Sequence, residues 1–479
     1  MSVVLEALAR HAGSRGDSPA LSSGASRISY AELDALVSET ARTLAEALQD
    51  GPGCVAIDLD NGAPWVILDL ALIGLGRPTL PAPSFFTAAQ MENALADAGA
   101  DWIICRTEPG ARLEVAGETV WLRRLDGVKG RLPAGTAKVT YTSGSTGAAK
   151  GVCLSQTQME RVAQSVVARL GAGYAGVHAP ILPLGVLLEN VAGLYPVLIA
   201  GGCYHVEPAA ELGCANPFRP DFARMGSTLK RAGATSLILV PELLRGIMAA
   251  RAFGAMEMPA LNFVAVGGAK VAPDLMTMAR DIGLPVYEGY GLTECASVVA
   301  MNAPGADRLQ TVGRPLDHVA LDIADDGEIV VRGRTFLGYA GGRSHAGPTA
   351  TGDVGAIDDD GFLQVTGRKG NLIITSFGRN VSPEWVESEL LAEPLIRHAL
   401  VFGEGRAELR ALVAPVFPNV DREQLASSVS RANARLPTYA QIGDFEVLAP
   451  LSVEKGELTG NGRMRRQTVL AANAAFVNR

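Results

Sequence analysis

Two hydrophobic patterns alternate along most of the chain. Short runs of β-branched and apolar residues, such as Cys54–Leu59 and Asp101–Cys105, are typical of buried strands. Longer segments with helical spacing separate such runs, among them the apolar segment Trp65–Gly76 and an amphipathic segment that starts at Gln156. This alternation favours an α/β fold with largely parallel sheets. Further strands are predicted at residues 138–143, 236–240, 262–268 and 284–291.

The pattern changes after residue 321. Asp322–Gly333 alternates around an Asp-Gly pair, which predicts a β-hairpin, and residues 353–368 repeat the arrangement around an Asp-Asp-Gly turn. Downstream, Ser382 is a predicted helix N-cap with Pro383 at the first helical position. We therefore place a domain boundary at this change from hairpins to a strand and helix. The predicted domains are residues 1–368 and 369–479.

Composition narrows the functional classes. The chain has 479 residues, is 48% hydrophobic and carries a net charge of -8, which argues against a nucleic-acid-binding surface. Its six cysteines lie far apart without a CxxC pair, as expected for reduced thiols in the cytoplasm. The scattered histidines do not predict a zinc site. We recognise neither a signal peptide nor an apolar run long enough to cross a membrane.

A polar loop follows the strand predicted at 138–143. It is rich in Ser, Thr and Gly, and Lys150 follows it. Small residues let backbone N–H groups approach a phosphate closely, and the lysine adds a cation. The order Lys150-Gly151-Val152 does not fit a Walker A motif. A solvent-exposed loop is one alternative, and a hydrolase with Ser145 as nucleophile is another, although no histidine partner can be located. The loop residues are Thr142, Ser143, Gly144, Ser145, Thr146 and Gly147.

Several further motifs follow the loop in a characteristic order. They are YGLTE at Tyr290–Glu294, TGD at Thr351–Asp353 and a GRKGNLI segment that contains Arg368. An ISYAEL segment at Ile28–Leu33 precedes them, and ELTGNGRMRR at residues 457–466 comes last. In this order the segments resemble the adenylate-forming superfamily, which comprises acyl-CoA synthetases, luciferases and peptide-synthetase adenylation domains. The resemblance covers nearly the whole chain.

The resemblance implies both a fold and a reaction. The fold has a large N-terminal domain of mostly parallel sheets flanked by helices with a small distorted barrel, plus a small mobile α+β C-terminal domain. In such enzymes a carboxylate attacks the α-phosphate of ATP, and acyl-AMP forms with release of pyrophosphate. Mg²⁺ offsets the phosphate charge. The thiol of coenzyme A, or the phosphopantetheine of an acyl carrier protein, then takes the acyl group.

By the same resemblance, individual residues acquire expected roles. The polar loop and Lys150 would clamp the β- and γ-phosphates, Thr293 would contact the α-phosphate, and Glu294 would hold Mg²⁺. The segment Gly267-Gly268-Ala269 would line the adenine and acyl pockets.

The nucleoside has its own expected contacts. Tyr290 would stack on adenine, and Asp353 would accept hydrogen bonds from the ribose hydroxyls with Arg368 beside it. Without these motifs, Asp353 would ordinarily be interpreted as a turn or capping residue, and Glu294 as a surface carboxylate.

The last motif departs from the family. The lysine expected to reach the substrate carboxylate and the α-phosphate aligns with Arg463, and Lys455 is a possible substitute. Arginine keeps its charge but has a bulkier, forked geometry. Two hypotheses follow: an AMP-forming acid–thiol ligase for a fatty or aryl acid, which we favour, or a nucleotide- or acyl-binding pseudoenzyme with impaired adenylation.

Four other positions carry weaker expectations. Lys369 would be the hinge of the C-terminal domain or an ordinary linker residue, and Gly378 would lie in a loop that lets the pantetheine arm pass. Leu187 and Leu188 would form an apolar wall of the acyl pocket. Glu189 would be either a helix-start residue or a buried polar anchor, and we favour the helix-start interpretation.

Overall fold

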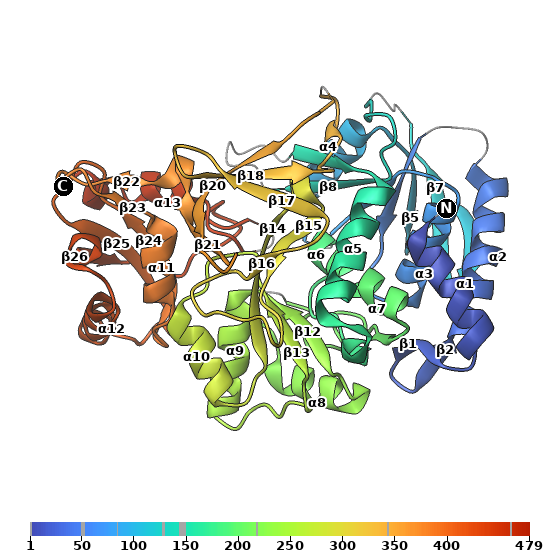
Figure 1. Ribbon diagram of the computed structural model, residues 1–479, viewed down its shortest axis with the longest axis horizontal. Coiled ribbons are helices and arrows are strands. Elements are labelled where there is room, and N and C mark those ends of the chain that lie inside the picture. Colours follow the sequence, from blue (N-terminus) through green and yellow to red (C-terminus); the bar gives the residue numbers. More distant parts are fainter. Residues whose placement is uncertain are drawn as a thin grey trace.

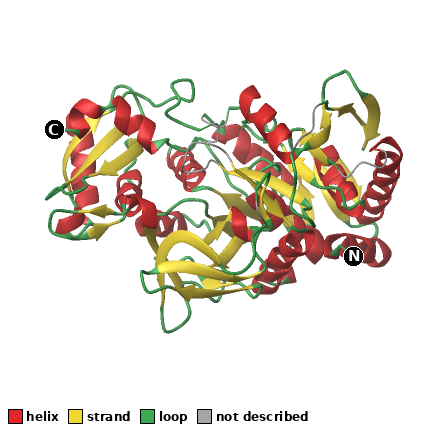
Figure 2. Ribbon diagram, turned by 90° about the horizontal axis from the view of Figure 1, so that it is seen from above, coloured by secondary structure: helices red, strands yellow, loops and turns green. Residues whose placement is uncertain are grey.

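The computed structural model describes residues 2–48, 53–83, 85–126, 130–142, 150–216, 219–342, 344–459 and 462–479. Large sheets and their helices form the N-terminal part, and a smaller C-terminal part lies at the opposite end of the molecule from the N-terminus (Figures 1 and 2). Among the described helices, none combines the length and the hydropathy needed to cross a membrane.

The first large sheet is parallel at its centre and antiparallel at both ends. It confirms the strands that the sequence predicts at 54–59, 101–105 and 138–143. In spatial order its strands are β19 (Gly338–Tyr339), β9 (Lys150–Leu154), β8 (Lys138–Thr142), β4 (Thr79–Pro81), β3 (Cys54–Asp58), β5 (Ala100–Cys105), β7 (Glu118–Arg124) and β6 (Ala111–Val115).

The second large sheet has a longer run of parallel pairs through its middle. Strands that are distant in sequence are neighbours in it, because the chain crosses over through helices. In spatial order its strands are β16 (Arg314–Pro315), β15 (Ser297–Met301), β14 (Val286–Leu292), β13 (Phe263–Val266), β12 (Ser236–Leu239), β10 (Val177–His178), β11 (Cys203–His205), β1 (Pro19–Ser23) and β2 (Ser26–Ser29).

Helices cover both large sheets. One apolar core joins side chains of both sheets to α1, α2, α3, α5 and α7, and a second core packs α8, α9 and α10 on one face of β12, β13 and β14. The sheets and helices therefore form the layered α/β fold that the sequence predicts. These helices are α1 (Val3–Arg15), α2 (Tyr30–Leu48), α3 (Ala63–Gly74), α4 (Ala88–Ala98), α5 (Gln156–Leu170), α6 (Leu187–Glu189), α7 (Tyr195–Ala200), α8 (Phe222–Ala232), α9 (Pro241–Ala252) and α10 (Pro273–Asp281).

A buried ion pair lies inside the first core. Asp69 stands in the middle of the apolar helix α3, and Lys138 Nζ donates to its Oδ1 at 2.8 Å. The Tyr195 hydroxyl donates to Asp69 Oδ2 at 2.7 Å, and the Asn190 side chain also contacts both groups. Burial lowers the pKa of Lys138, and Asp69 opposes this shift. Because Lys138 opens β8, the pair fixes the strand that ends at Thr142.

A smaller antiparallel sheet corresponds to the expected distorted barrel. Its two hairpins confirm those predicted at 322–333 and 353–368, and Gly327 takes a φ of 82° in the first turn. Glycine suits this turn because left-handed backbone strains other residues. The strands, in spatial order, are β17 (Val319–Ile323), β18 (Glu328–Gly333), β20 (Thr349–Ile357) and β21 (Leu363–Arg368).

The C-terminal part has apolar clusters of its own. The Ser382 hydroxyl caps α11 by accepting from the backbone N–H of Trp385 at 3.3 Å, and Pro383 is the first helical residue, as predicted. The domain boundary at 368/369 itself stays a prediction. The elements are β22 (Ile373–Ile374), β23 (Asn380–Val381), α11 (Pro383–Leu391), β24 (Ile396–Phe402), β25 (Leu409–Pro415), α12 (Arg422–Ala434), β26 (Ile442–Val447), α13 (Arg466–Ala472) and α14 (Ala474–Val477).

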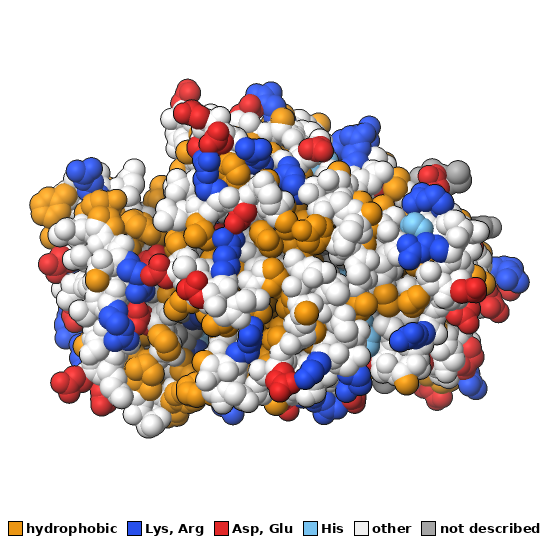
Figure 3. All heavy atoms as spheres, turned by 60° about the horizontal axis from the view of Figure 1, so that its bottom comes forward, with side chains coloured by type: hydrophobic (Ala, Val, Ile, Leu, Met, Phe, Trp, Pro, Cys, Tyr) orange, Lys and Arg blue, Asp and Glu red, His pale blue; other side chains and the backbone are white. Residues whose placement is uncertain are grey.

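Charged side chains of both signs are interspersed over the face shown in Figure 3. Such a mixed surface agrees with the modest negative net charge of -8. All six cysteines are described and free of disulfides, as predicted for reduced thiols.

Candidate functional site

The ends of the predicted phosphate loop are held by two paired strands. Thr142 at the end of β8 is opposite Lys150 at the start of β9. The loop residues Ser143, Gly144, Ser145, Thr146 and Gly147 lie outside the described residues, so their predicted contacts and the Ser145 hydrolase alternative stay predictions.

Lys150 and Glu294 both contact the side chain of Tyr339. Lys150 Nζ lies 5.5 Å from the centre of the Tyr339 ring, and the Tyr339 hydroxyl donates to Glu294 Oε1 at 3.0 Å. Thr293 precedes Glu294 in a short 3-10 turn, η3 (Thr293–Cys295), directly after β14, and both residues line the central cavity. Sequence reasoning did not select Tyr339, because only the pairing of β19 with β9 brings it to Lys150.

Asp353 is the centre of a second group. Tyr290 donates its hydroxyl hydrogen to Asp353 Oδ2 at 2.7 Å, and Arg368 Nε lies 2.8 Å from Oδ1. Burial raises the pKa of Asp353, while Arg368 and Tyr290 both oppose the shift. The structure thus brings together all three residues predicted to contact the nucleoside, in a cavity wall that they share.

The segment after β13 forms a tight wall of the same cavity, which Gly267, Gly268 and Ala269 line. Their expected role in the adenine and acyl pockets stays a prediction. A Cβ at Gly267 would come within 3.1 Å of the Gly289 carbonyl oxygen. Gly268 has a φ of 87°, which disfavours any other residue. Gly267 therefore allows close packing against β14, and a Cβ at Gly268 would lie 3.9 Å from Arg463 Nη2.

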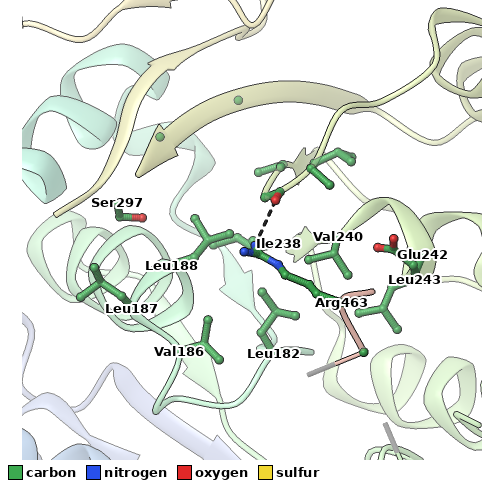
Figure 4. Close-up of a pocket in the computed structure, with 18 of the residues that line it drawn as sticks. Leu182, Val186, Leu187, Leu188, Ile238, Val240, Glu242, Leu243, Ser297 and Arg463 are labelled. Atoms are coloured by element: carbon green, nitrogen blue, oxygen red, sulfur yellow. Dashed lines mark hydrogen bonds between the residues drawn. The ribbon is translucent and has the colours of Figure 1, made fainter. Parts of the chain in front are cut away.

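Arg463 reaches this wall from the C-terminal part. Its Nη2 donates to the Gly268 carbonyl at 3.1 Å (Figure 4). Desolvation within the cleft lowers the pKa of Arg463, although the side chain keeps contact with solvent, and Glu242 at the start of α9 opposes the shift. Arginine stays protonated in proteins. Lys455 is exposed and is not among the residues that line the cavity.

An apolar pocket surrounds the Arg463 guanidinium. Leu187 and Leu188 line it, and Ile238 lies next to the guanidinium (Figure 4). The role of Leu187 and Leu188 as the wall of an acyl pocket stays a prediction. The whole cavity, which also includes the groups around Asp353 and Glu294, has a volume of about 4010 Å³. Its other apolar side chains near Arg463 are Leu182, Val186, Val240 and Leu243.

The favoured interpretation of Glu189 was wrong. Glu189 ends the short helix α6, but its side chain is completely buried, and Tyr204 donates its hydroxyl hydrogen to Glu189 Oε1 at 3.0 Å. His178 Nε2 lies 2.9 Å from the same oxygen. Glu189 is therefore the buried polar anchor. Local sequence could not distinguish the two interpretations, because both place an acidic residue in a first helical turn.

The predicted hinge lies directly after β21. Lys369 opens the 3-10 turn η4 (Lys369–Asn371), and its Nζ contacts Asp326 and lies 3.0 Å from Glu328 Oε2. Gly378 has a φ of 69° in the turn between β22 and β23. These positions are compatible with the predicted roles of a hinge and an open loop, which stay predictions.

These features define a cavity in a large N-terminal part, into which Arg463 of the C-terminal part reaches. The model of the AMP-binding enzyme family matches residues 8–340, and that of the AMP-binding enzyme C-terminal domain matches residues 370–479. The chain belongs to the AMP-binding enzyme family, and the resemblance stated from the sequence motifs is confirmed.

Relatives with known activities are similar over most of their length. Long-chain-fatty-acid–CoA ligase FadD15 of Mycobacterium tuberculosis is 28% identical, with 85% of this chain and 84% of that protein covered. 2-Succinylbenzoate–CoA ligase of Geobacillus kaustophilus is also 28% identical, with 80% and 81% covered.

Solved structures share the fold. Anthranilate CoA ligase AuaEII in complex with anthranoyl-AMP matches with a TM-score of 0.80 at 18% identity, and the match covers 99% of this chain and 98% of that one. O-succinylbenzoate coenzyme A synthetase of Bacillus subtilis, in complex with ATP and magnesium ion, matches with a TM-score of 0.76 at 24% identity, covering 96% and 98%.

Proposed function

We propose that this protein is an AMP-forming acid–thiol ligase. It activates a carboxylic acid with ATP and transfers the acyl group to a thiol. The observation that carries the proposal is the position of Arg463, which extends from the C-terminal part to the Gly268 carbonyl at an apolar pocket. A fixed cation there can contact the carboxylate of an acid whose tail enters the pocket, and the α-phosphate as well.

The nucleotide would lie between the two groups of polar residues. Asp353 would accept hydrogen bonds from the ribose, with its carboxylate oriented by Tyr290 and Arg368. Tyr290 would present its ring to adenine while its hydroxyl stays on Asp353. Lys150 and the polar loop would receive the β- and γ-phosphates, and Thr293 the α-phosphate.

The chain offers a partner for a magnesium ion. Mg²⁺ in nucleotide enzymes is usually held by one or two carboxylates together with phosphate oxygens and water. Glu294 fits this requirement, since Tyr339 fixes its Oε1 and the cavity lies in front of it. When bound, the ion would offset phosphate charge. No group of three or more His, Cys, Asp or Glu side chains placed to hold a metal ion occurs in the described part of the chain. Glu294 would therefore hold the ion together with the nucleotide phosphates.

Two steps follow from this arrangement. A carboxylate oxygen attacks the α-phosphorus, the bond to the pyrophosphate oxygen breaks, and acyl-AMP forms. Arg463 offsets the repulsion between the carboxylate and the phosphate, and Lys150 offsets the charge of the departing pyrophosphate. In the second step a thiol sulfur attacks the acyl carbonyl, AMP leaves with the bonding electrons, and the thiol proton passes to solvent.

The apolar lining around Arg463 supports a fatty or aryl acid. Coenzyme A is the preferred thiol because the relatives FadD15 and 2-succinylbenzoate–CoA ligase are named for it. A carrier-protein phosphopantetheine is the alternative acceptor, and a cytoplasmic location is part of the proposal.

One feature favours a second candidate. Arg463 replaces the family lysine, and a forked cation that already donates to a backbone carbonyl could hinder the in-line approach of the carboxylate. The protein would then bind nucleotide and acid without efficient adenylation.

Acid-dependent exchange of labelled pyrophosphate into ATP separates the candidates. A ligase supports exchange with at least one acid of a fatty and aryl panel, whereas a pseudoenzyme binds ATP without exchange. Lys150→Ala should weaken ATP use and Glu294→Ala the Mg²⁺ dependence, by about 1.5–3 kcal/mol each for a lost charged contact. Kinetics that stay unchanged in both variants would refute these assignments.

A further inference from the structure

The cavity that receives Arg463 continues along one face of β12. Ser236, Ile238 and Val240 alternate along the chain, so their side chains share a face of the strand, and all three line the cavity. Ile238 and Val240 lie beside Arg463 (Figure 4). Ser236 is two residues before Ile238, which lies next to the guanidinium, and this separation corresponds to about 7 Å along a strand. Ser236 therefore marks the end of this wall that is remote from the guanidinium, which we call the deep end.

Between its two ends this space is apolar. On the neighbouring strand β13, Ala265 pairs with Ile238 and Phe263 pairs with Ser236, and both line the cavity. Leu170 at the end of α5 and Val197 in α7 line it as well. An acyl chain that extends from the carboxylate position would lie against these side chains.

The deep end is polar and is built by three adjacent strands. His178 on β10 pairs in register with Ser236 on β12 and with Tyr204 on β11, so the three side chains form a row on one face of the sheet. His178 Nδ1 lies 3.0 Å from Ser236 Oγ, and its ring stacks on Tyr204 with centroids 5.4 Å apart. His178 and Ser236 both line the cavity.

Glu189 determines how the protons of this row are arranged. As a carboxylate it can only accept, and it takes the Nε2 hydrogen of His178 at 2.9 Å and the Tyr204 hydroxyl hydrogen. A neutral imidazole with its hydrogen on Nε2 has an acceptor at Nδ1. With His178 neutral, the Ser236 hydroxyl donates to His178 Nδ1, and the lone pairs of Ser236 Oγ remain for a donor in the cavity.

The backbone also preserves this arrangement. Gly193, in the π-helical turn η2 (Asn190–Leu194), lines the cavity next to the pair. A Cβ at this position would come within 2.3 Å of Glu189 Oε1 and 3.2 Å of His178 Nε2. The glycine therefore leaves room for Glu189 to reach His178. Glu189 Oε2 is buried and has no hydrogen-bond partner among the described residues. The contacts of Glu189 with His178 and Tyr204 therefore use Oε1 alone.

We propose that the acid activated by this protein carries a hydrogen-bond donor, a hydroxyl or an amine, at the end remote from its carboxyl group. Ser236 Oγ accepts from that donor, and His178 and Glu189 are positioning residues. This inference rests on the proposed function. A plain hydrocarbon end would bury the Ser236 lone pairs against apolar groups without a hydrogen bond, which is unfavourable, whereas a terminal donor satisfies them.

Matched acids test the inference in the pyrophosphate-exchange assay. Straight-chain acids of increasing length are compared with their ω-hydroxy and ω-amino counterparts. At the best length, kcat/KM for one donor-bearing acid should exceed that of the plain acid at least fivefold, and the two donor series show whether a hydroxyl or an amine is preferred. In Ser236→Ala this ratio should fall towards one, and Ser236→Thr, which keeps the hydroxyl, should restore it.

Ser227→Ala is a matched control, because this serine is exposed on α8 and bonds only the Ala223 carbonyl among its described neighbours. It should keep the wild-type ratio. Circular dichroism melting of each variant verifies folding. Plain acids preferred at every length, or an unchanged ratio in folded Ser236→Ala, would overturn the inference while the ligase activity stands. Exchange with none of these acids would overturn the inference, and exchange with no acid of the fatty and aryl panel either would overturn the proposed function as well.

Discussion

Removal of the Arg463 side chain gives the sharpest test of the proposed chemistry. Arg463 Nη2 already donates to the Gly268 carbonyl at 3.1 Å, which aims the guanidinium at the pocket without a ligand to hold it there. A hydrogen bond to a charged group contributes about 1.5–3 kcal/mol, and an anionic carboxylate and phosphate would both be contacted. At the upper end, Arg463→Ala should lower kcat/KM for acid-dependent exchange about a hundredfold or more.

The lysine variant separates charge from geometry. Arg463→Lys keeps the cation and removes the fork, and a shorter ammonium gives up the contact with Gly268. We expect it to keep or improve adenylation, since a point charge satisfies the carboxylate and the phosphate in turn. A hundredfold loss in this variant would instead mean that the guanidinium fork itself is required.

The assay must separate the two half-reactions. Adenylation is measured by pyrophosphate exchange, and thioester formation is measured from synthetic acyl-AMP with coenzyme A. Arg463→Ala should impair the first and spare the second, because the arginine acts on the carboxylate and the α-phosphate. Arg479→Ala serves as a control in the same part of the chain, because Arg479 is exposed and its Nη2 lies 3.8 Å from Glu446 Oε2. Wild-type exchange in Arg463→Ala would refute the role assigned to the residue.

Two further predictions concern stability. Lys138→Met leaves Asp69 buried without its cation and should lower the free energy of unfolding by about 3–5 kcal/mol in urea denaturation. Lys230→Met, which removes an exposed pair, should change it by less than about 1 kcal/mol; equal effects would contradict the argument. Burial raises the pKa of Glu288 to about 7. The folded state thus holds this proton more tightly than the unfolded state, so stability falls as pH rises from about 4.5 to about 7. Glu288→Gln should reduce that slope and stabilise the protein at pH 8 by up to about 3 kcal/mol; an unchanged slope between pH 5 and 8 would refute it.

Local pattern was sufficient where the chain folds back on itself. The Asp-Asp-Gly turn predicts the hairpin of β20 and β21. Counting outward from the turn would pair Asp353 with Gly367, however, and an irregularity between Val354 and Gly355 shifts the partner of Asp353 to Arg368. The N-cap at Ser382 could likewise be read from adjacent residues. Such features depend on neighbours within a few positions, so the sequence contains the information that determines them.

Strand pairing between segments that are far apart in the chain could not be predicted from the local sequence. β10 consists of Val177 and His178 alone, too short for a hydrophobic period, and its register with Ser236 is set by the packing of the whole sheet. Tyr339 meets Glu294 only because β19 joins the edge of the first sheet. These contacts could not be predicted from one sequence, although they contribute the groups that distinguish this site.

The two ends of the cavity are held by different kinds of contact, and this has a consequence for selectivity. Arg463 arrives on the C-terminal part, which contacts the N-terminal part through side chains such as Arg245, bonded to the Leu391 carbonyl at 2.7 Å, and Arg435, 3.4 Å from Asp274. A partly exposed pair such as Arg435–Asp274 contributes little to stability, as the predicted rotation of the C-terminal domain would require. Ser236 and its row belong to the sheet and stay in place. Preference for the remote end of the acid should therefore be the same in adenylation and in thioester formation, whereas dependence on Arg463 should be confined to adenylation.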